Sequence, residues 1–339
     1  MNSNPASRID PEQRWFVGVD VGGTSIKLGL ISTNCQVADP LRLPTNQQAG
    51  PEDAIQRIRA ALQPAFQELG DQICGVGLGT PGPLDTDKGL ILDPVNMPGW
   101  RNFPVRDQLS KALERPVIYT NDANAAAYGE YWCGNWRDCD SLVLITLGTG
   151  VGTGIILQGE PLTGANGQAA ECGHMSVAYG ETARTCHCGR PGHLEAYSSA
   201  SAVADFAVAL AGEHPTSELA KLLKLQGSLS ARDVYDCALR QDVTSIQLID
   251  QTAEYLARGI ANLAQTIDPH TVLLGGAMDF GGADCEIGQR FLMAIQQRVR
   301  QRVFTQIADK IRIEFASLGG SAGWIGAAGL ANRDYDQQL

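Results

Sequence analysis

Metal-binding residue types gather in one stretch of the chain, residues 171–202. This stretch contains three of the five histidines and three of the nine cysteines, with a glutamate near each end of that group. Cys186 and Cys188 are one residue apart, with His174 before them and His193 after them. Four cysteine or histidine ligands are typical of a structural zinc site. Two alternatives stay open: His193 faces away from the cysteines, or the loop holds no metal.

The remaining cysteines are expected to be structural. Cys172 should be buried beside the loop, and His187, between two cysteines, should point outward. A disulfide framework is rare in a large cytoplasmic chain, so we expect small buried thiols at the scattered positions. These positions are Cys35, Cys74, Cys133, Cys139, Cys237 and Cys285.

Two glycine-rich segments have the composition of phosphate-binding turns. Residues 15–32 and residues 141–157 each read as a strand, a tight glycine turn and a second strand. Glycine lets the backbone approach a ligand closely, and successive N–H groups form a nest for phosphate oxygens. The candidate phosphate-binding positions are Gly22, Gly23, Thr24, Gly148, Thr149, Gly150 and Gly152.

Charged residues flank the first of these turns. Asp20 ends an apolar strand and is a candidate to hold Mg²⁺ through water, and Lys27 would offset phosphate charge. Neither turn is a Walker P-loop, and neither is a dinucleotide motif, because each leads into a strand. The segment GVGLGTPG (75–82) fails as a dinucleotide motif too, because it runs into a proline-rich loop. Alone, each hairpin is an ordinary turn; the pair favours a phosphate site.

A candidate general base follows the strand expected at 116–120. Asp122 stands in the sequence N-D-A-N at the start of an alanine-rich helix, where a carboxylate at the end of a strand can accept a proton. The alternative is an ordinary helix cap. Both roles are compatible if Asn121 or Asn124 caps the helix and Asp122 points inward.

Strands and helices alternate along the chain, which indicates an α/β fold. The two glycine hairpins suggest a duplicated architecture. The region 213–243 has no readable motif and is expected to be helical packing. Helices are expected over 52–69, 104–114, 198–212, 215–225, 230–240, 245–267, 286–303 and 321–333, and further strands over 73–79, 271–276 and 311–315.

The composition is that of an acidic globular protein. Its 339 residues suggest two domains, and 44% hydrophobic residues allow a large core. The net charge of −11 disfavours nucleic-acid binding. No apolar run could span a bilayer, and the N-terminus lacks a signal-peptide core. We therefore expect a soluble cytoplasmic protein with a disordered lead over 1–14 and no nucleic-acid or membrane partner.

Several motifs, taken in order, resemble the ROK family (repressors, open reading frames, kinases), and within it the bacterial ATP-dependent glucokinases. The resemblance covers about residues 15–335. It implies an actin-like ATPase (ribonuclease H-like) fold with two α/β lobes flanking a cleft, transfer of a phosphoryl group from MgATP to a hexose, and a homodimer. The segments that carry it are DVGGTSIK, NDANAAAYGE, LGTGVGTGIILQGEPLTGANGQAAECGH, CHCGRPGHLE and LLGGAM.

The resemblance also implies domain bounds and site residues. The small lobe would cover 15–122, completed by the C-terminal helix at about 318–335, and the large lobe 123–317, with a zinc loop over 172–195. Asp122 matches the family's catalytic base, and Gly275 and Gly276 match its adenosine contact. Carboxylates that accept two hydroxyl bonds reject analogues lacking them. The implied sugar contacts are Gly82, Asn96, Asn121, Asp122, Glu171, His174 and Glu195.

The family's zinc loop reads C-x-C-G-x-x-G-C-x-E, with the histidine of E-x-G-H as the remaining ligand, which is His174 here. This chain departs from that pattern because His193 replaces the third cysteine. Imidazole is a good zinc ligand, so the change would give a Cys₂His₂ site with one negative charge fewer. Such a metal would be structural, tying the loop of Glu171 to the helix of Glu195.

The leading hypothesis is therefore a glucokinase that makes glucose 6-phosphate. A kinase for another sugar, such as fructose, mannose, an N-acetylhexosamine or allose, is the first alternative. A sugar sensor without catalytic activity is the second, and the presence of Asp20, Lys27 and Asp122 argues against it. The family's repressors carry an N-terminal DNA-binding segment; a hairpin that begins by residue 18, with the acidic charge, favours a kinase.

Overall fold

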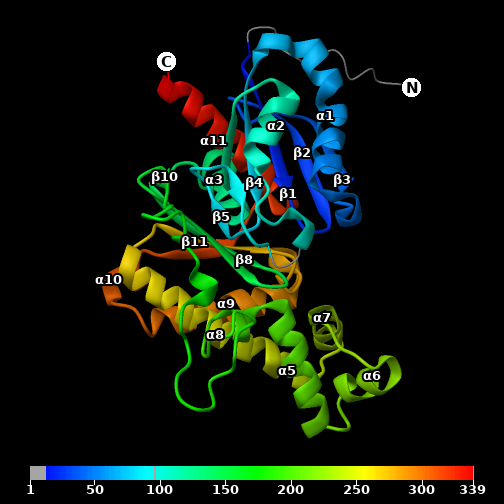
Figure 1. Ribbon diagram of the computed structural model, residues 1–339. Helices are drawn as coiled ribbons and strands as arrows, with labels where there is room; N and C mark the ends of the chain where they lie inside the picture. Colours follow the sequence, from blue (N-terminus) through cyan, green and yellow to red (C-terminus); the bar gives the residue numbers. More distant parts are fainter. Residues whose placement is uncertain (1–12, 95–96, 339) are drawn as a thin grey trace, which may run out of the picture. The chain divides into compact units, whose positions relative to one another are not determined.

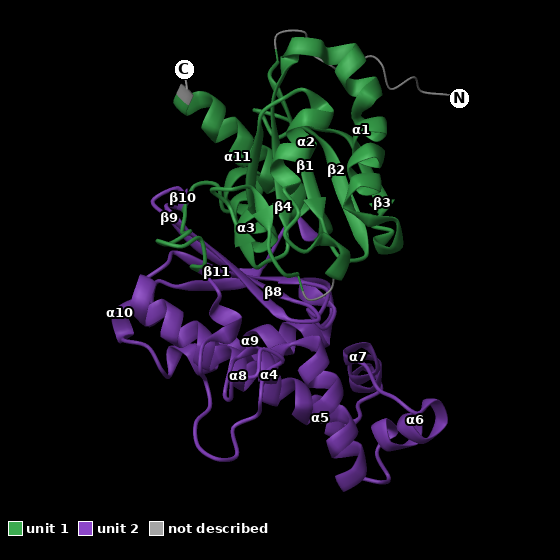
Figure 2. Cartoon of the chain, viewed as in Figure 1, with its two compact units in different colours: residues 1–138, 161–169, 320–339 green, residues 139–160, 170–319 purple. Residues whose placement is uncertain are grey.

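The computed structural model describes residues 13–94 and 97–338 (Figure 1). The chain forms two compact units (Figure 2): unit 1 comprises 1–138, 161–169 and 320–339, and unit 2 comprises 139–160 and 170–319. Among the described residues, no helix is both long and apolar enough to cross a bilayer. Most of the expected N-terminal lead, and the candidate sugar contact Asn96, lie outside the described residues.

Unit 1 is built on a five-stranded sheet with the order β3-β2-β1-β4-β7. The strands β1, β4 and β7 run parallel, whereas β2 is antiparallel to both β1 and β3. Its strands are β1 (Trp15–Val21), β2 (Ser25–Ser32), β3 (Val37–Pro44), β4 (Ile73–Thr80) and β7 (Val117–Asn121), with a small pair β5 (Leu84–Asp85) and β6 (Leu90–Ile91). Its helices are α1 (Gly50–Leu69), α2 (Val105–Leu113), α3 (Asp122–Cys133) and α11 (Ala322–Gln338).

The sheet of unit 1 lies between two helical layers. Val17 and Val19 of β1 are fully buried and belong to the core cluster that includes apolar residues of α1 and α2. Gly18, between them, faces the opposite side, where its backbone lies against Trp324 of α11. Helix α11 also packs on α3 and β4. Burial on both faces explains why β1 is a continuous apolar run.

Unit 2 repeats this plan with the sheet order β10-β9-β8-β11-β12. The strands β8, β11 and β12 are parallel, and β9 returns antiparallel to β8, so both units start with a glycine hairpin followed by two parallel strands. The expected duplication is therefore present. Its strands are β8 (Ser141–Leu147), β9 (Val151–Leu157), β10 (Glu160–Pro161), β11 (Thr271–Gly276) and β12 (Arg312–Phe315). Its helices are α4 (Glu195–Ser198), α5 (Ala200–Glu213), α6 (Glu218–Gln226), α7 (Ala231–Leu239), α8 (Val243–Ile267), α9 (Glu286–Arg300) and α10 (Thr305–Ala308).

Two features of the backbone differ from the sequence-based expectations for unit 1. The edge strand β3 was not expected, because its sequence VADPLRLP contains two prolines; an edge position tolerates them. The expected boundary between the lobes, at residue 122, differs from the observed division of the chain. Helix α3 belongs to unit 1, because it packs on α11.

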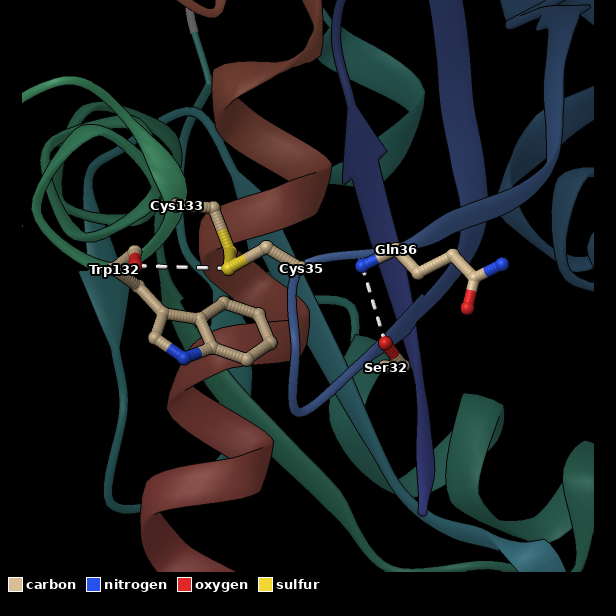
Figure 3. The surroundings of a disulfide bond; sticks show 5 residues. All are labelled: Ser32, Cys35, Gln36, Trp132 and Cys133. Carbon is tan, nitrogen blue, oxygen red and sulfur yellow. Dashed lines mark hydrogen bonds between the residues drawn. A yellow bond between two sulfur atoms is a disulfide. The ribbon is translucent and has the colours of Figure 1, made fainter. Parts of the chain in front are cut away.

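A disulfide joins Cys35 to Cys133, so the prediction of scattered buried thiols was wrong for this pair (Figure 3). It connects the turn between β2 and β3 to the last residue of α3, with the Cα atoms 5.6 Å apart. The two cysteines are 98 residues apart in sequence, and only the fold brings them together. Of the other scattered cysteines, Cys237 is fully buried as expected, whereas Cys74, Cys139 and Cys285 are partly exposed.

Candidate active site and metal centre

In unit 1, the candidate catalytic carboxylates lie at the carboxyl ends of parallel strands. Asp20 of β1 is aligned with Gly79 of β4, and Gly79 with Thr120 of β7. Asp122 follows β7 directly as the first residue of α3. A Cβ atom added to Gly79 would lie 3.6 Å from the Cα of Asp122, so the backbones approach closely here. The strand order therefore brings Asp20 and Asp122 to the same end of the sheet, where the parallel strands finish.

Both carboxyl groups titrate abnormally. Burial and the negative charge of Asp122 raise the pKa of Asp20 to about 6, although Lys27 opposes the shift. Burial likewise raises the pKa of Asp122, against hydrogen bonds from the backbone and the charge of Lys27. The Lys27 Nζ lies 3.7 Å from the Asp20 Oδ2. Two carboxylates with only one nearby lysine form a site that favours an added cation.

Asn121 caps the helix that Asp122 begins. Its side-chain oxygen accepts hydrogen bonds from the backbone N–H of Ala123 at 2.8 Å and of Asn124 at 3.3 Å. The Oδ1 of Asp122 also accepts from Ala123 at 2.8 Å, which leaves its second oxygen for other partners. The structure therefore settles the cap: Asn121 takes this role, as one of the two expected possibilities, and Asn124 does not.

The first glycine turn is held from outside by the segment that follows β3. The backbone N–H of Thr45 donates to the Thr24 carbonyl at 3.0 Å, and the Thr45 hydroxyl donates to the carbonyl of Gly22. The side-chain amide of Gln47 donates to the carbonyl of Gly23. With its carbonyls bonded on one side, the turn is fixed in shape. Sequence reasoning missed Thr45 and Gln47, because nothing in their local sequence marks them.

In unit 2, the second glycine turn is tied to α5 and to Glu195. The carbonyl of Gly148 accepts from the Ala200 N–H at 2.8 Å. The Oε2 of Glu195 accepts from the Val151 N–H at 3.0 Å. A Cβ atom added to Gly150 would lie 2.4 Å from this oxygen, so any side chain at this position would displace the carboxylate. The sequence alone favours a surface position for Glu195, but the structure places its carboxylate beside the turn.

A cavity of about 360 Å³ lies beside this turn in unit 2. One wall comes from the turn, and another is the segment 277–281 that directly follows the expected adenosine glycines Gly275 and Gly276. The third wall is the start of α7, in the region 213–243 that carried no sequence motif. The residues of that wall are Ser230, Ala231, Arg232 and Tyr235. No local signal could have found them, because the fold alone brings α7 to the cavity.

The four expected metal ligands lie together in unit 2. His174, Cys186, Cys188 and His193 each offer an atom, and these atoms all lie within 4.8 Å of one another. The Sγ of Cys186 is 3.7 Å from the Nδ1 of His174, and the Sγ of Cys188 is 3.1 Å from the Nδ1 of His193. Tetrahedral zinc with ordinary bond lengths would place such atoms about 3.5 Å apart. The geometry therefore fits a Cys₂His₂ site, and His193 faces the cysteines.

The loop around this cluster is shaped by its own backbone. Short antiparallel bridges pair Ser176 with His193 and Thr185 with Pro191. The Sγ of Cys186 also lies 3.3 Å from the Oε1 of Glu195. Burial raises the pKa of the Cys186 thiol to about 12, so the thiol stays protonated at neutral pH unless a cation displaces the proton. One contact therefore joins the cluster to the carboxylate that holds the second turn.

The remaining candidate residues from the sequence lie on the surface or near the ends of secondary-structure elements. Gly82 follows β4 and forms a cis peptide bond with Pro83. Glu171 is exposed beside the short helix that contains His174, and His187 is exposed as expected. Cys172 is only partly buried, contrary to expectation.

The fold and these residues define an α/β protein of the actin-like ATPase class. The chain belongs to the ROK family, whose model matches residues 16–334. A glucokinase of Halalkalibacterium halodurans is 38% identical, over 94% of this chain and 96% of that protein. The crystal structure of a ROK hexokinase from Thermus thermophilus matches with a TM-score of 0.80 and 31% identity, covering 95% of this chain and 99% of that one. A ROK family glucokinase from Streptomyces griseus, in complex with glucose and AMPPNP, matches with a TM-score of 0.76 and 31% identity, over 94% and 99% of the two chains.

Proposed function

We propose that this protein phosphorylates a hexose with ATP, and that the hexose is glucose. The observation that carries the proposal is the group of charged residues at the carboxyl ends of the parallel strands in the unit 1 sheet. There Asp122 lies close to Asp20 and Lys27, in a chain that belongs to a family with glucokinase members. A sensor without activity would need none of these three charges.

Asp122 is the proposed general base. Its position lets a carboxylate oxygen accept the proton of the attacking sugar hydroxyl. A raised pKa makes the carboxylate a stronger base than an exposed aspartate, which suits proton transfer near neutral pH. Asn121 keeps the helix end satisfied, so Asp122 does not have to act as the cap.

Asp20 and Lys27 are the proposed phosphate-side residues. Mg²⁺ bound with ATP would neutralise the phosphate oxygens and the charge that develops during transfer. Burial and the charge of Asp122 raise the pKa of Asp20, and a water-bridged cation would stabilise its ionised form. Lys27 offsets the remaining phosphate charge. The two glycine turns offer backbone N–H groups, and the cavity beside α7 in unit 2 is the proposed adenosine pocket.

Glu171, His174 and Glu195 are the proposed sugar ligands that unit 2 contributes, and Gly82, Asn96, Asn121 and Asp122 are those proposed for unit 1. A structural Zn²⁺ on His174, Cys186, Cys188 and His193 would hold the first group in place. If the metal occupies the Nδ1 of His174, the Nε2 atom is left for a sugar hydroxyl. We further propose a homodimer, as the resemblance implies, and a cytoplasmic location, which the composition favours.

The experiment is an ADP-release assay over a panel of glucose, mannose, fructose, allose and N-acetylhexosamines. We expect glucose to give the highest kcat/KM. The similarity to the Thermus thermophilus hexokinase supports the broader alternative, and a higher value for another hexose would replace glucose without removing the kinase. ADP release with none of these sugars would refute the proposed function.

The role of Asp122 is tested by Asp122→Asn. We expect kcat to fall by about 10²- to 10⁴-fold, the usual contribution of a general base, with glucose binding largely retained. Asp138→Asn, at an exposed position of the same unit, is the matched control and should keep full activity. Near-normal turnover of Asp122→Asn would refute the assignment.

A further inference from the structure

A second cavity in unit 2, of about 490 Å³, lies against the metal-binding loop and is separate from the proposed adenosine pocket. One wall is loop residues 177–184 that precede Cys186. The opposite wall consists of aromatic and basic side chains of α4, α5 and α8: Tyr197, Phe206, Tyr255 and Arg258. Nothing in the proposed reaction uses these residues. The volume lies within the range of small-molecule sites.

The cavity is basic although the protein is acidic. Arg184 and Arg258 line it, and none of its lining residues among those described is acidic. The Arg184 guanidinium lies 3.4 Å from the ring centre of Phe206. Within the described residues it makes no hydrogen bond, so its donors are available. Stacking holds the guanidinium in position, and its free donors can bind a planar or tetrahedral anion.

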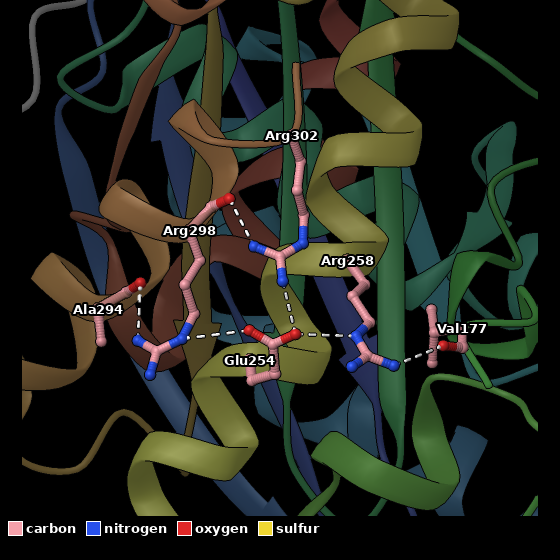
Figure 4. A network of polar contacts seen from close by, with 6 residues as sticks. All are labelled: Val177, Glu254, Arg258, Ala294, Arg298 and Arg302. Atoms are coloured by element: carbon pink, nitrogen blue, oxygen red, sulfur yellow. Dashed lines mark hydrogen bonds and ion pairs between the residues drawn. The ribbon is translucent and has the colours of Figure 1, made fainter.

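Arg258 belongs to a network of three arginines around Glu254 (Figure 4). Its Nε atom donates to Glu254 at 3.0 Å and its Nη1 atom to the Val177 carbonyl at 3.3 Å. Glu254 also pairs with Arg298 at 3.2 Å and with Arg302 at 2.6 Å. One carboxylate thus serves three guanidiniums, which leaves an excess of positive charge. Burial opposes ionisation of Glu254, but the hydrogen bond from Arg258 and the neighbouring arginines lower its pKa.

Polar and aromatic groups complete the cavity. Tyr197 and Tyr255 stack with ring centres 4.1 Å apart. The hydroxyl groups of Tyr255 and Thr182 have no hydrogen-bond partner among the described residues. The Arg258 guanidinium lies 4.8 Å from the ring centre of Tyr255, so the stacked rings offer an aromatic edge and not a free face. Such a wall combines apolar contact with hydroxyl donors and acceptors, as a polyol requires.

We propose that this cavity binds a small sugar phosphate. The phosphate would be held by the fork of Arg184 and by the remaining Nη2 of Arg258, because guanidinium pairs bind phosphate in a bidentate manner. The polyol would lie against the exposed edge of Tyr255 and the Thr182 hydroxyl. The ligand belongs to the chemical class of the product that the proposed function implies, and in that respect the proposal rests on that function.

The cavity is connected to the proposed sugar ligands through the chain itself. The Arg184 N–H donates to the Tyr197 hydroxyl at 2.7 Å. Tyr197 lies two residues after Glu195 on α4, and Arg184 lies two residues before Cys186. Occupancy would therefore hold both ends of the segment 184–197, which carries three of the four candidate metal ligands, and it should change KM for the hexose more than kcat.

The test is calorimetric titration with glucose 6-phosphate in the presence of saturating glucose, which occupies the substrate site. Arg184→Gln should weaken this binding by about tenfold or more, since a charged bidentate contact is lost. Arg184→Lys, which keeps the charge but not the fork, should restore it only in part. Arg300→Gln removes an exposed charge on α9 and should leave binding unchanged.

Equal binding by the wild type and Arg184→Gln would overturn the proposal, as would an absence of binding by the wild type in the millimolar range. It would also be overturned if Arg184→Gln altered only the oligomeric state, because the cavity would then be an interface between copies. Retained binding in Asp122→Asn supports it. If the wild type binds glucose 6-phosphate through Arg184 but releases no ADP with any sugar, the proposed kinase function is refuted, and the proposal that the cavity binds a sugar phosphate is supported. If the wild type has normal kinase activity but does not bind glucose 6-phosphate in this cavity, the kinase function is supported and the proposal about the cavity is refuted.

Discussion

Replacing Asp20 by asparagine should stabilise the ligand-free protein while abolishing its activity. The folded-state pKa of Asp20 is raised from 3.8 to about 6 by burial and by Asp122, with Lys27 opposing. A carboxyl group with a raised folded-state pKa contributes its full stability below pH 3.8, and that contribution is lost as the pH rises through about 6. At pH 8 the ionised side chain therefore lowers the free energy of unfolding, and asparagine removes this penalty.

The magnitude follows from the shift. Each pKa unit corresponds to about 1.4 kcal/mol, so a shift of roughly two units predicts a gain of about 3 kcal/mol at pH 8. At about pH 5 the folded-state group is largely protonated already, and the linkage relation leaves roughly half of the gain. For a unit of this size, the gain at pH 8 corresponds to a rise in melting temperature of roughly 6–12 °C.

The assay is differential scanning calorimetry of wild type and Asp20→Asn at both pH values, without nucleotide. Asp138→Asn is the control, because it removes an exposed charge from the same unit. A lower melting temperature for Asp20→Asn at pH 8, or an equal gain at pH 5 and pH 8, would refute the reasoning. Added Mg²⁺ should reduce the difference in melting temperature between wild type and Asp20→Asn if Asp20 helps to hold the ion.

Three further predictions concern the metal, the second turn and the disulfide. Elemental analysis should find about one zinc per chain, and His193→Ala should lose metal to a chelator faster than His193→Cys; a folded, active protein without zinc would contradict this. Gly150→Ala should raise the glucose KM by about tenfold by displacing Glu195, whereas Gly212→Ala, with open space around it, should not. Cys35→Ser should lower the free energy of unfolding by about 2–4 kcal/mol, and a full complement of titratable thiols in the native protein would show that the disulfide does not form.

The sequence predicted the parts of the site that lie on continuous segments. The hairpin turns, Asp122 and the four candidate metal ligands are each marked by residue type and short spacing, and the strands of the hairpins are strongly apolar. The alternation of strands and helices likewise predicted the α/β class. By contrast, the exposed edge strand β3 was missed because its prolines are unfavourable in most strands. Its position at the edge leaves its backbone N–H groups unconstrained on one side, a property that only the assembled sheet defines.

The features that sequence reasoning could not reach are those formed by distant segments. Tyr235 and Arg232 lie on an ordinary amphipathic helix, and only the packing of α7 brings them to the cavity beside the second turn. Glu195 is ambiguous for the same reason, because its partner is the Val151 N–H, 44 residues earlier. The cluster of candidate metal ligands depends both on sequence spacing and on contacts that only the folded chain provides. Its candidate ligands are readable from spacing, but the contact between Cys186 and Glu195, a proposed sugar ligand, follows only from the folded loop.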